Sequence, residues 1–192
     1  SGVCNHCNNY YDYMTNVVGT KQECEQKLDM LVDYLKKAGR GKDYDCIMGL
    51  SGGVDSSYLS WYVVKELGLR PLIVHVDAGW NSELAVNNIQ NLVEKLNIDL
   101  HTLVIDWEEM KDLQKSFFKS GIANLDVPKD HAFVASLYKE ASKFGIKDIL
   151  NGGNMQTESI LPESWGYDAN DSKSLTSIQK RFGTVKLKNY PI

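Results

Sequence analysis

The chain has 192 residues, of which 43% are hydrophobic and 24% are charged, and its formal net charge is −4. This length suits one α/β domain with a sizeable buried core. No basic excess is present, which argues against long nucleic acid as a partner. The longest apolar stretches, such as residues 72–76, are far shorter than the roughly 20 residues that cross a bilayer. With no visible signal peptide, we expect a cytoplasmic protein that binds neither a membrane nor long nucleic acid.

The first twenty residues are polar and aromatic without a clear period, so we expect residues 1–20 to form an irregular N-terminal arm. Cys4 and Cys7 lie in this arm as a single Cys-x-x-Cys pair, which alone is weak evidence for zinc. Cys24 falls in a predicted helix and Cys46 in a predicted buried strand. Reduced thiols are therefore expected rather than a disulfide framework.

Beyond the arm, predicted helices alternate with predicted strands. Apolar residues recur on one helical face at residues 21–38, 59–67, 86–96, 107–118, 128–144 and 175–182. Short apolar runs predict strands at residues 44–50, 72–76, 100–105 and 148–150. Strand–helix units of roughly 25–35 residues predict an α/β fold, a doubly wound parallel sheet in a three-layer α/β/α arrangement.

Residues 21–192 are thus expected to be one domain. The chain begins at Ser1 without a Met and ends at Ile192 without a helix stop. Both features are typical of a fragment of a longer protein.

A glycine-rich loop, residues 51–57, follows the first predicted strand and precedes a helix. Ligands of doubly wound sheets bind beyond the carboxyl ends of the strands. Gly52 and Gly53 carry no side chains that would keep a phosphate off the backbone, whose N–H groups then form an anion cradle with the helix start. Hydroxyl donors come from Ser51, Ser56 and Ser57. A plain capped glycine turn is the alternative, but the complete motif in this position favours a phosphate site.

Asp55 is the unexpected member of this loop, because a carboxylate close to a phosphate should repel it. Two roles explain it: a helix cap, or an organiser of the Mg²⁺ that neutralises the phosphates.

The sequence Ser-Gly-Gly-Val-Asp-Ser resembles the motif of the N-type ATP pyrophosphatase, or PP-loop, superfamily. That superfamily includes GMP synthetase, NAD synthetase, asparagine synthetase and tRNA thiolation enzymes. The resemblance implies an enzyme that splits ATP into AMP and pyrophosphate after a nucleophile attacks the α-phosphate. It implies that the departing diphosphate is held by Ser51, Gly52, Gly53, Asp55 and Ser56.

The second predicted strand ends at Val76 and Asp77, where PP-loop enzymes usually bind adenine and ribose. The resemblance implies that the Val76 backbone pairs with adenine and that Asp77 reaches ribose or metal. A turn-forming role before Gly79 is the alternative for Asp77. His75 faces the opposite side of the strand and is expected to be a packed core histidine.

Residues 152–158 follow the fourth predicted strand and resemble the second loop of the same superfamily. Gly152 and Gly153 permit close approach of a phosphate. Asn154 is expected to donate to that phosphate, and Glu158 to bind Mg²⁺ through water. A plain helix start is the alternative.

Longer strings resemble a narrower branch, the N-acetyl sugar amidotransferases, which make acetamidino sugars for bacterial surface polysaccharides such as lipopolysaccharide. These strings are residues 2–7, 77–81, 127–133 and 158–167. The branch carries a further Cys-x-x-Cys upstream and more sequence downstream, neither of which is present here. The resemblance therefore implies that Cys4 and Cys7 are half of a four-cysteine zinc site.

The branch implies a reaction in which the acetamido oxygen of a nucleotide-linked N-acetyl sugar attacks ATP and ammonia then displaces AMP. Since no glutaminase module is recognisable, ammonia is expected from a separate glutaminase subunit. The residues leave open whether the protein is a monomer or an oligomer. Trp165 and Tyr167 are candidates for stacking on sugar or base, or for anchoring a loop. Asp130 and His131 are candidates for the sugar pocket or for proton transfer; helix capping is the alternative for Asp130.

Two other functions remain open. A tRNA thiolase would need a catalytic cysteine near ATP and a basic surface; the composition offers no basic excess, and Cys46 on the core strand is a poor nucleophile. A non-catalytic sensor would bind ATP without cleaving it.

Overall fold

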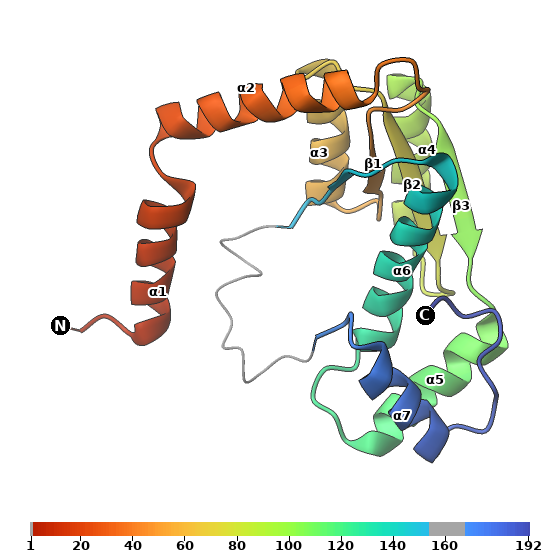
Figure 1. Ribbon diagram of the computed structural model, residues 1–192. Helices are drawn as coiled ribbons and strands as arrows, with labels where there is room; N and C mark the ends of the chain where they lie inside the picture. Colours follow the sequence, from red (N-terminus) through yellow and green to blue (C-terminus); the bar gives the residue numbers. More distant parts are fainter. Residues whose placement is uncertain (1, 154–167) are drawn as a thin grey trace.

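A four-stranded parallel sheet forms the centre of the computed structural model, which describes residues 2–153 and 168–192 (Figure 1). The strand order is β3-β2-β1-β4, and Met48 of β1 pairs with Ile73 of β2 and Leu150 of β4. The strands are β1 (Cys46–Gly49), β2 (Pro71–Asp77), β3 (Leu100–Val104) and β4 (Ile149–Leu150). Each lies within a run predicted from the sequence or extends it by one residue.

Every helix predicted after residue 20 is present. The helices are α1 (Asn5–Tyr13), the π-helix η1 (Met14–Val18), α2 (Lys21–Ala38), α3 (Val54–Lys65), α4 (Glu83–Leu96), α5 (Trp107–Ser120), α6 (Val127–Phe144) and α7 (Ser172–Phe182). Side chains at the N-caps fix five of the starts by accepting backbone N–H groups: Cys4, Thr20, Ser82, Asp106 and Asp171.

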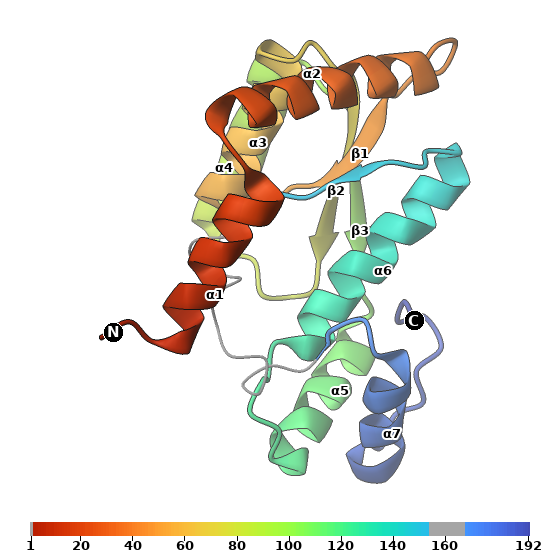
Figure 2. The ribbon, with the colours of Figure 1, turned by 60° about the vertical axis from the view of Figure 1, so that its left-hand side comes forward.

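Helices cover both faces of the sheet, because neighbouring residues of each strand point in opposite directions. Met48 of β1 packs with Val63 of α3 and Ile89 of α4. Ile47, one residue earlier, packs on the other face with Met110 of α5 and with Ala132 and Ala141 of α6. Figure 2 shows α3 and α4 on one side of the strands and α6 on the other. The doubly wound α/β fold is confirmed.

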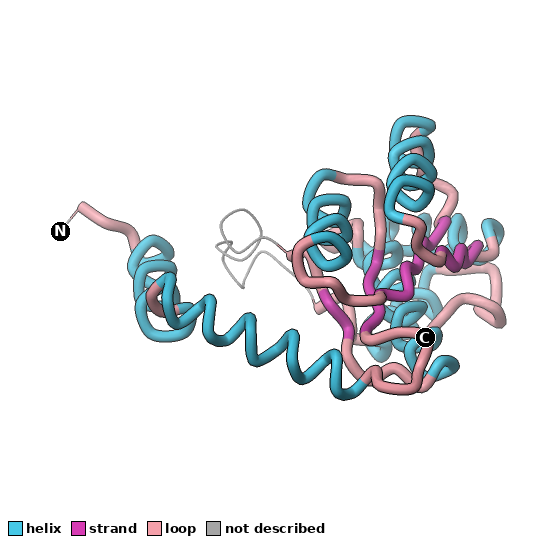
Figure 3. Tube along the Cα trace, turned by 90° about the horizontal axis from the view of Figure 1, so that it is seen from above, coloured by secondary structure: helices cyan, strands magenta, loops and turns pink. Residues whose placement is uncertain are grey.

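The N-terminal arm is not irregular, and that prediction is wrong. Residues 5–18 are helical, and α1 begins at Cys4, whose sulfur accepts the Cys7 N–H at 3.4 Å. None of the α1 residues is buried, so the sequence carried no apolar period from which a helix could be recognised. The arm and the first half of α2 extend away from the sheet (Figure 3).

Two buried carboxylates on α5 hold the segment that follows α7. Glu109 accepts the backbone N–H groups of residues 188–190 at 2.8–3.1 Å. Asp112 accepts the N–H groups of Thr184 and Val185, both at 2.8 Å, and the Thr184 hydroxyl at 2.7 Å. Burial alone raises the pKa of Asp112, but these hydrogen bonds and one from Gln179 outweigh it and hold the pKa well below its usual range. We call Glu109 and Asp112 the carboxylate clamp.

No helix in the described ranges is both long and apolar enough to cross a membrane.

Candidate functional site

Two glycine loops leave the sheet at the point where its strand order reverses. β1 is the first strand in the chain, yet it lies between β2 and β4. Doubly wound sheets bind ligands in the crevice beyond the carboxyl ends of such neighbouring strands. A Cβ on Gly152, after β4, would lie 3.5 Å from Cα of Ser56, after β1. The loop after β4 therefore packs directly against the loop after β1.

Serine hydroxyls close the loop after β1 around its own backbone. The Ser51 N–H donates to Oγ of Ser56 at 3.2 Å, and the two Oγ atoms are 3.0 Å apart. Gly53 is the N-cap of α3 and provides no side-chain cap. The first N–H groups of α3 thus lack the side-chain acceptor that begins α2, α4, α5 and α7, and this leaves them available to an anion.

Gly52 is held by α4, the helix beside the loop. Its φ is +78°, and a Cβ there would lie 2.4 Å from the Ala85 carbonyl oxygen. Nδ2 of Asn88 donates to the Gly52 carbonyl oxygen at 3.1 Å. Sequence reasoning missed Ala85 and Asn88, because a helix that supports a loop carries no motif of its own.

Asp55 lies in the first turn of α3 with its residue exposed. It is not the helix cap, so that interpretation is wrong; the N-cap is Gly53. An acidic residue in the first turn is favourable to the helix dipole without any bound ion. The role in organising Mg²⁺ stays a prediction.

At the end of β2, Asp77 forms a turn: its Oδ1 accepts the Gly79 N–H at 2.9 Å. Val76 beside it is buried. His75 is buried as expected, with Nδ1 3.0 Å from the Leu50 carbonyl oxygen and Nε2 3.1 Å from Nδ2 of Asn81. Because a carbonyl only accepts, Nδ1 carries the proton, and the histidine ties the start of the glycine loop to the loop after β2.

The structure separates Asp130 from His131 by exposure. Leu137 of α6 faces Gly49 at the end of β1. Asp130 lies seven residues earlier on the same helix, so it is roughly 10 Å along the helix axis from that contact. Burial raises the pKa of Asp130, against the opposing charge of Lys129. His131 is only 5% exposed; its Nδ1 lies 2.6 Å from the Ala169 carbonyl oxygen and its ring stacks on Tyr190.

Neither residue caps α6, whose N-cap is Asp126, so the capping alternative for Asp130 is wrong. Nε2 of His131 has no hydrogen-bond partner within the described ranges. Proton transfer by this pair stays a prediction, and Asp130 is the more accessible of the two.

Four candidate residues, and so their expected contacts, lie outside the described residues: Asn154, Glu158, Trp165 and Tyr167. Gly153, which is described, donates its N–H to Oδ1 of Asn151 at 2.9 Å.

Zinc has no support in the described part of the chain. No group of three or more His, Cys, Asp or Glu residues there is arranged to hold a metal ion. The Sγ atoms of Cys4 and Cys7 are 3.4 Å apart, but they supply only two ligands. Cys46 is fully buried, and burial together with the charges of Asp45 and Asp148 raises its pKa to about 12. Such a thiol is a poor nucleophile, as the sequence indicated.

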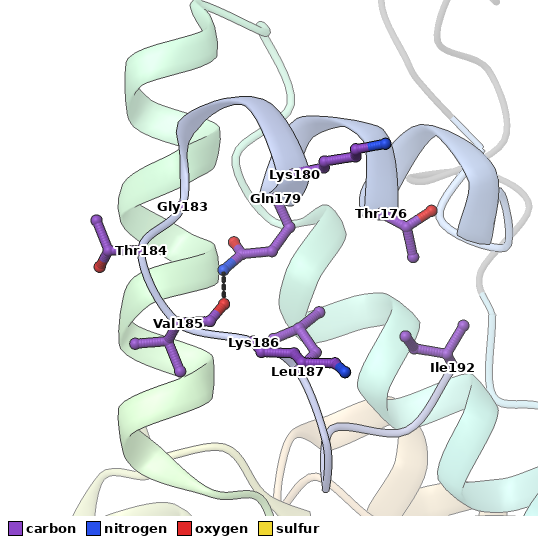
Figure 4. A pocket seen from close by; sticks show the side chains of 9 residues that line it. All are labelled: Thr176, Gln179, Lys180, Gly183, Thr184, Val185, Lys186, Leu187 and Ile192. Atoms are coloured by element: carbon purple, nitrogen blue, oxygen red, sulfur yellow. Dashed lines mark hydrogen bonds between the residues drawn. The ribbon is translucent and has the colours of Figure 1, made fainter.

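Two hollows lie away from the glycine loops. One, of about 400 Å³, lies between the last turns of α7 and the segment that follows it (Figure 4). Its lining comes from residues 176–192, which include none of the predicted site residues. The other, of about 570 Å³, lies at the carboxyl end of β3.

A family model described as NAD synthase matches residues 23–181. The chain belongs to the NAD synthase family. The match covers β1 to β4 and both glycine loops, which confirms the PP-loop superfamily and an ATP-using synthetase-like domain. It does not reach the N-acetyl sugar branch.

Proteins with similar sequences belong to the same superfamily. A tRNA(Ile)-lysidine synthase of Chlamydia pneumoniae is 30% identical over 60% of this chain and 34% of its own length. A GMP synthase [glutamine-hydrolyzing] of Elusimicrobium minutum is 28% identical over 65% of this chain and 23% of its own length. The chain thus spans about a third or less of these relatives.

Solved structures of the family show the same fold. The NH3-dependent NAD synthetase of Campylobacter jejuni, in complex with nitrate, superimposes with a TM-score of 0.51 at 14% identity, over 81% of this chain and 72% of that one. The glutamine-dependent NAD+ synthetase of Acinetobacter baumannii, in complex with ADP, gives 0.51 at 21% identity, over 68% and 26%.

Proposed function

We propose that this protein is an ATP-dependent amidotransferase that converts the acetamido group of a nucleotide-linked N-acetyl sugar into an acetamidino group. The observation that carries the proposal is the loop of residues 51–57. It leads into α3, whose first N–H groups have no side-chain cap, and it contains Gly52 with a positive φ. It contacts the second glycine loop where the strand order reverses. The strings shared with the sugar amidotransferases supply the acceptor class.

The β- and γ-phosphates of ATP lie against the N–H groups at the start of α3, with hydroxyls of Ser51, Ser56 and Ser57 as further donors. The adenosine extends toward Val76 and Asp77. Asp77 already gives one carboxylate oxygen to the turn, and its second oxygen is the one that faces ribose.

Mg²⁺ fits this site, because it is usually held by one or two carboxylates together with substrate phosphates. Asp55 in the first turn of α3 and Asp77 at the end of β2 are two described carboxylates next to this site. Bound there, the ion would neutralise charge on the phosphates.

The chain's own contribution to the rate is positioning and charge stabilisation. The acetamido oxygen attacks the α-phosphorus, the bond to the β-phosphate oxygen breaks, and pyrophosphate leaves against the α3 N–H groups. Ammonia then attacks the activated carbon, and AMP departs with the former acetamido oxygen. Asp130, half-buried in the first turn of α6, is the group proposed to take a proton from the ammonium that forms. We propose a separate glutaminase as the ammonia source.

The test is turnover of the full chain with ATP, Mg²⁺, ammonium and UDP-N-acetylglucosamine, followed as AMP and pyrophosphate release. We expect Asp55→Ala to lower the rate by roughly 100-fold or more, because it removes the charge that organises the phosphates. Its unfolding temperature should stay close to that of the parent, since Asp55 is exposed.

Glu66→Ala, at the opposite end of the same helix, is the matched control and should leave turnover unchanged. Unchanged turnover in Asp55→Ala would show that the loop is wrongly assigned. AMP release that does not depend on the sugar would remove the amidotransferase. ATP binding without any cleavage would favour the sensor.

A further inference from the structure

The hollow at the carboxyl end of β3 is a groove with one aromatic wall and one polar wall. It is lined by Val104, Ile105, Asp106, Trp107, Glu108 and Asn189. In Figure 1 the end of β3, the start of α5 and the C-terminal segment meet at this place. None of these residues was assigned a role from the sequence.

One of the lining residues, Trp107, forms a pair with a second exposed tryptophan, Trp80, which packs on it from outside the lining. Trp107 is 41% exposed and Trp80, from the loop after β2, is 59% exposed; their ring centroids are 5.4 Å apart at 70°. Gly79, with φ +83°, lies so close that a Cβ there would be 2.5 Å from the Trp107 ring. Backbone packing therefore fixes the ring, and part of it still faces outward.

The polar wall is also fixed in place. Asp106 is the N-cap of α5, where its Oδ1 accepts the Glu109 N–H at 3.1 Å, and the residue as a whole is exposed. Asn189 is held through its backbone N–H by Glu109 of the carboxylate clamp. Glu108 on the rim is paired with Lys111 at 3.1 Å.

We propose that this groove binds the pyranose ring of the N-acetyl sugar acceptor. The apolar C–H face of the ring lies on Trp107, with Trp80 beside it, and the ring hydroxyls donate to Asp106 and exchange hydrogen bonds with Asn189. A pocket with an apolar wall and a few fixed polar groups is typical of small-molecule sites. The inference rests on the proposed function, since it names the acceptor subsite of the same reaction.

The donors and charges of the groove favour a sugar over a nucleotide. The exposed carboxylates of Asp106 and Glu108 accept hydrogen bonds. A pyranose offers them several hydroxyl donors, whereas the uracil base of the nucleotide offers a single N–H donor. The carboxylates at Asp106 and Glu108 repel phosphate groups.

The position fits the chemistry as well. Parallel strands are about 4.8 Å apart, so the end of β3 lies roughly 10 Å from the end of β1 across the sheet. A sugar at β3 thus lies at the same carboxyl edge of the sheet as an ATP whose diphosphate is held after β1, on the far side of the end of β2.

Indole N–H signals of the full ¹⁵N-labelled chain provide the test, assigned by single Trp→Phe variants. On addition of UDP-N-acetylglucosamine we expect the Trp80 and Trp107 signals to shift and the Trp61 signal to stay, and free N-acetylglucosamine at higher concentration should move the same two. UDP alone should move neither. Shifts of both with UDP alone, or with the non-hydrolysable ATP analogue alone, would overturn the inference.

Affinity measured on variants gives the second readout. Trp107→Ala should raise the Kd for the sugar nucleotide roughly tenfold or more and change the Kd for the ATP analogue less than twofold. Trp80→Ala, in an exposed loop position, should act in the same direction if Trp107→Ala does not fold. Trp61→Ala is the matched control, because Trp61 is 39% exposed on α3, outside the groove lining.

Failures of the two proposals give different results. Unchanged sugar affinity in both groove variants would overturn the groove even where ATP is cleaved. If the chain binds the sugar at Trp107 but does not bind the ATP analogue, the groove proposal is supported and the proposed reaction is contradicted.

Discussion

Gly52 shows how much the candidate site depends on one backbone conformation. The motif predicted a glycine here so that phosphate can approach, and the structure adds a second reason. The positive φ and the Ala85 carbonyl 2.4 Å from any Cβ exclude a side chain even before a ligand binds. The sequence revealed the chemistry of the position but not its contact with α4, because that contact joins residues far apart in the chain.

Gly52→Ala should therefore displace the loop. We expect ATP turnover to fall roughly 100-fold, since displacements of about 1 Å at a reacting group have effects of that size. Gly121→Ala is the control: its φ is +71°, but no atom lies within 4 Å of the added Cβ. It should lose only about 1 kcal/mol of stability, the cost of a left-handed alanine, and keep full turnover. Equal turnover in the two variants would contradict the role of Ala85.

Cys46 should remain unreactive in the folded protein because its pKa is raised to about 12. A thiol whose folded pKa is raised stabilises the fold below the ordinary thiol pKa, and this contribution is lost as the pH rises toward 12. At pH 8 we expect a disulfide reagent to label the exposed Cys4 and Cys7 first, and Cys46 only in denaturant. Cys46→Ala should reduce the labelled thiol count in denaturant alone. Rapid labelling of Cys46 in the native protein would disprove its burial.

At the scale of elements, α5 combines two tasks, of which its sequence reveals only the first. Its apolar face packs on the sheet, and the periodicity predicted that face correctly. No motif in the sequence marks Glu109 and Asp112, yet both are buried because the segment after α7 folds over them. Local pattern predicts a helix well, but a buried carboxylate is recognised only once its distant partners are known.

Asp112→Asn should weaken this attachment, because an amide cannot accept all the N–H groups that the carboxylate accepts. We expect a loss of about 3 kcal/mol in the free energy of unfolding at pH 7, measured with urea. The lowered pKa of Asp112 sets the pH dependence. Its stabilisation is present above the ordinary carboxyl pKa near 4 and is lost as the pH falls through the lower folded pKa.

The difference between parent and Asp112→Asn should therefore shrink below about pH 4. Asp33→Asn, exposed on α2, is the matched control and should change stability little at any pH. A constant difference from pH 7 to pH 2 would show that the carboxylate charge is not what holds the segment.

At the scale of the whole molecule, the sequence predicted the doubly wound sheet because each strand is a short apolar run and each helix after residue 20 has an apolar face. It could not give the strand order, which decides that the loops after β1 and β4 meet while the end of β3 lies to one side. The phosphate loop was predictable from its motif. The tryptophan pair and the helical arm were not, since the first depends on two loops folding together and the second buries no residue.

The carboxylate clamp grips residues 184–190 mainly through peptide N–H groups. A peptide group is the same whatever side chain it carries, so these contacts do not depend on the exposed side chains of the segment, whereas Leu187 and Tyr190 pack on the core. Lys186, Lys188 and Asn189 are exposed along that path. Of these three, Asn189 lines the groove at the end of β3, so we expect a replacement there to change what the groove binds while the backbone hydrogen bonds to Glu109 keep the segment in place.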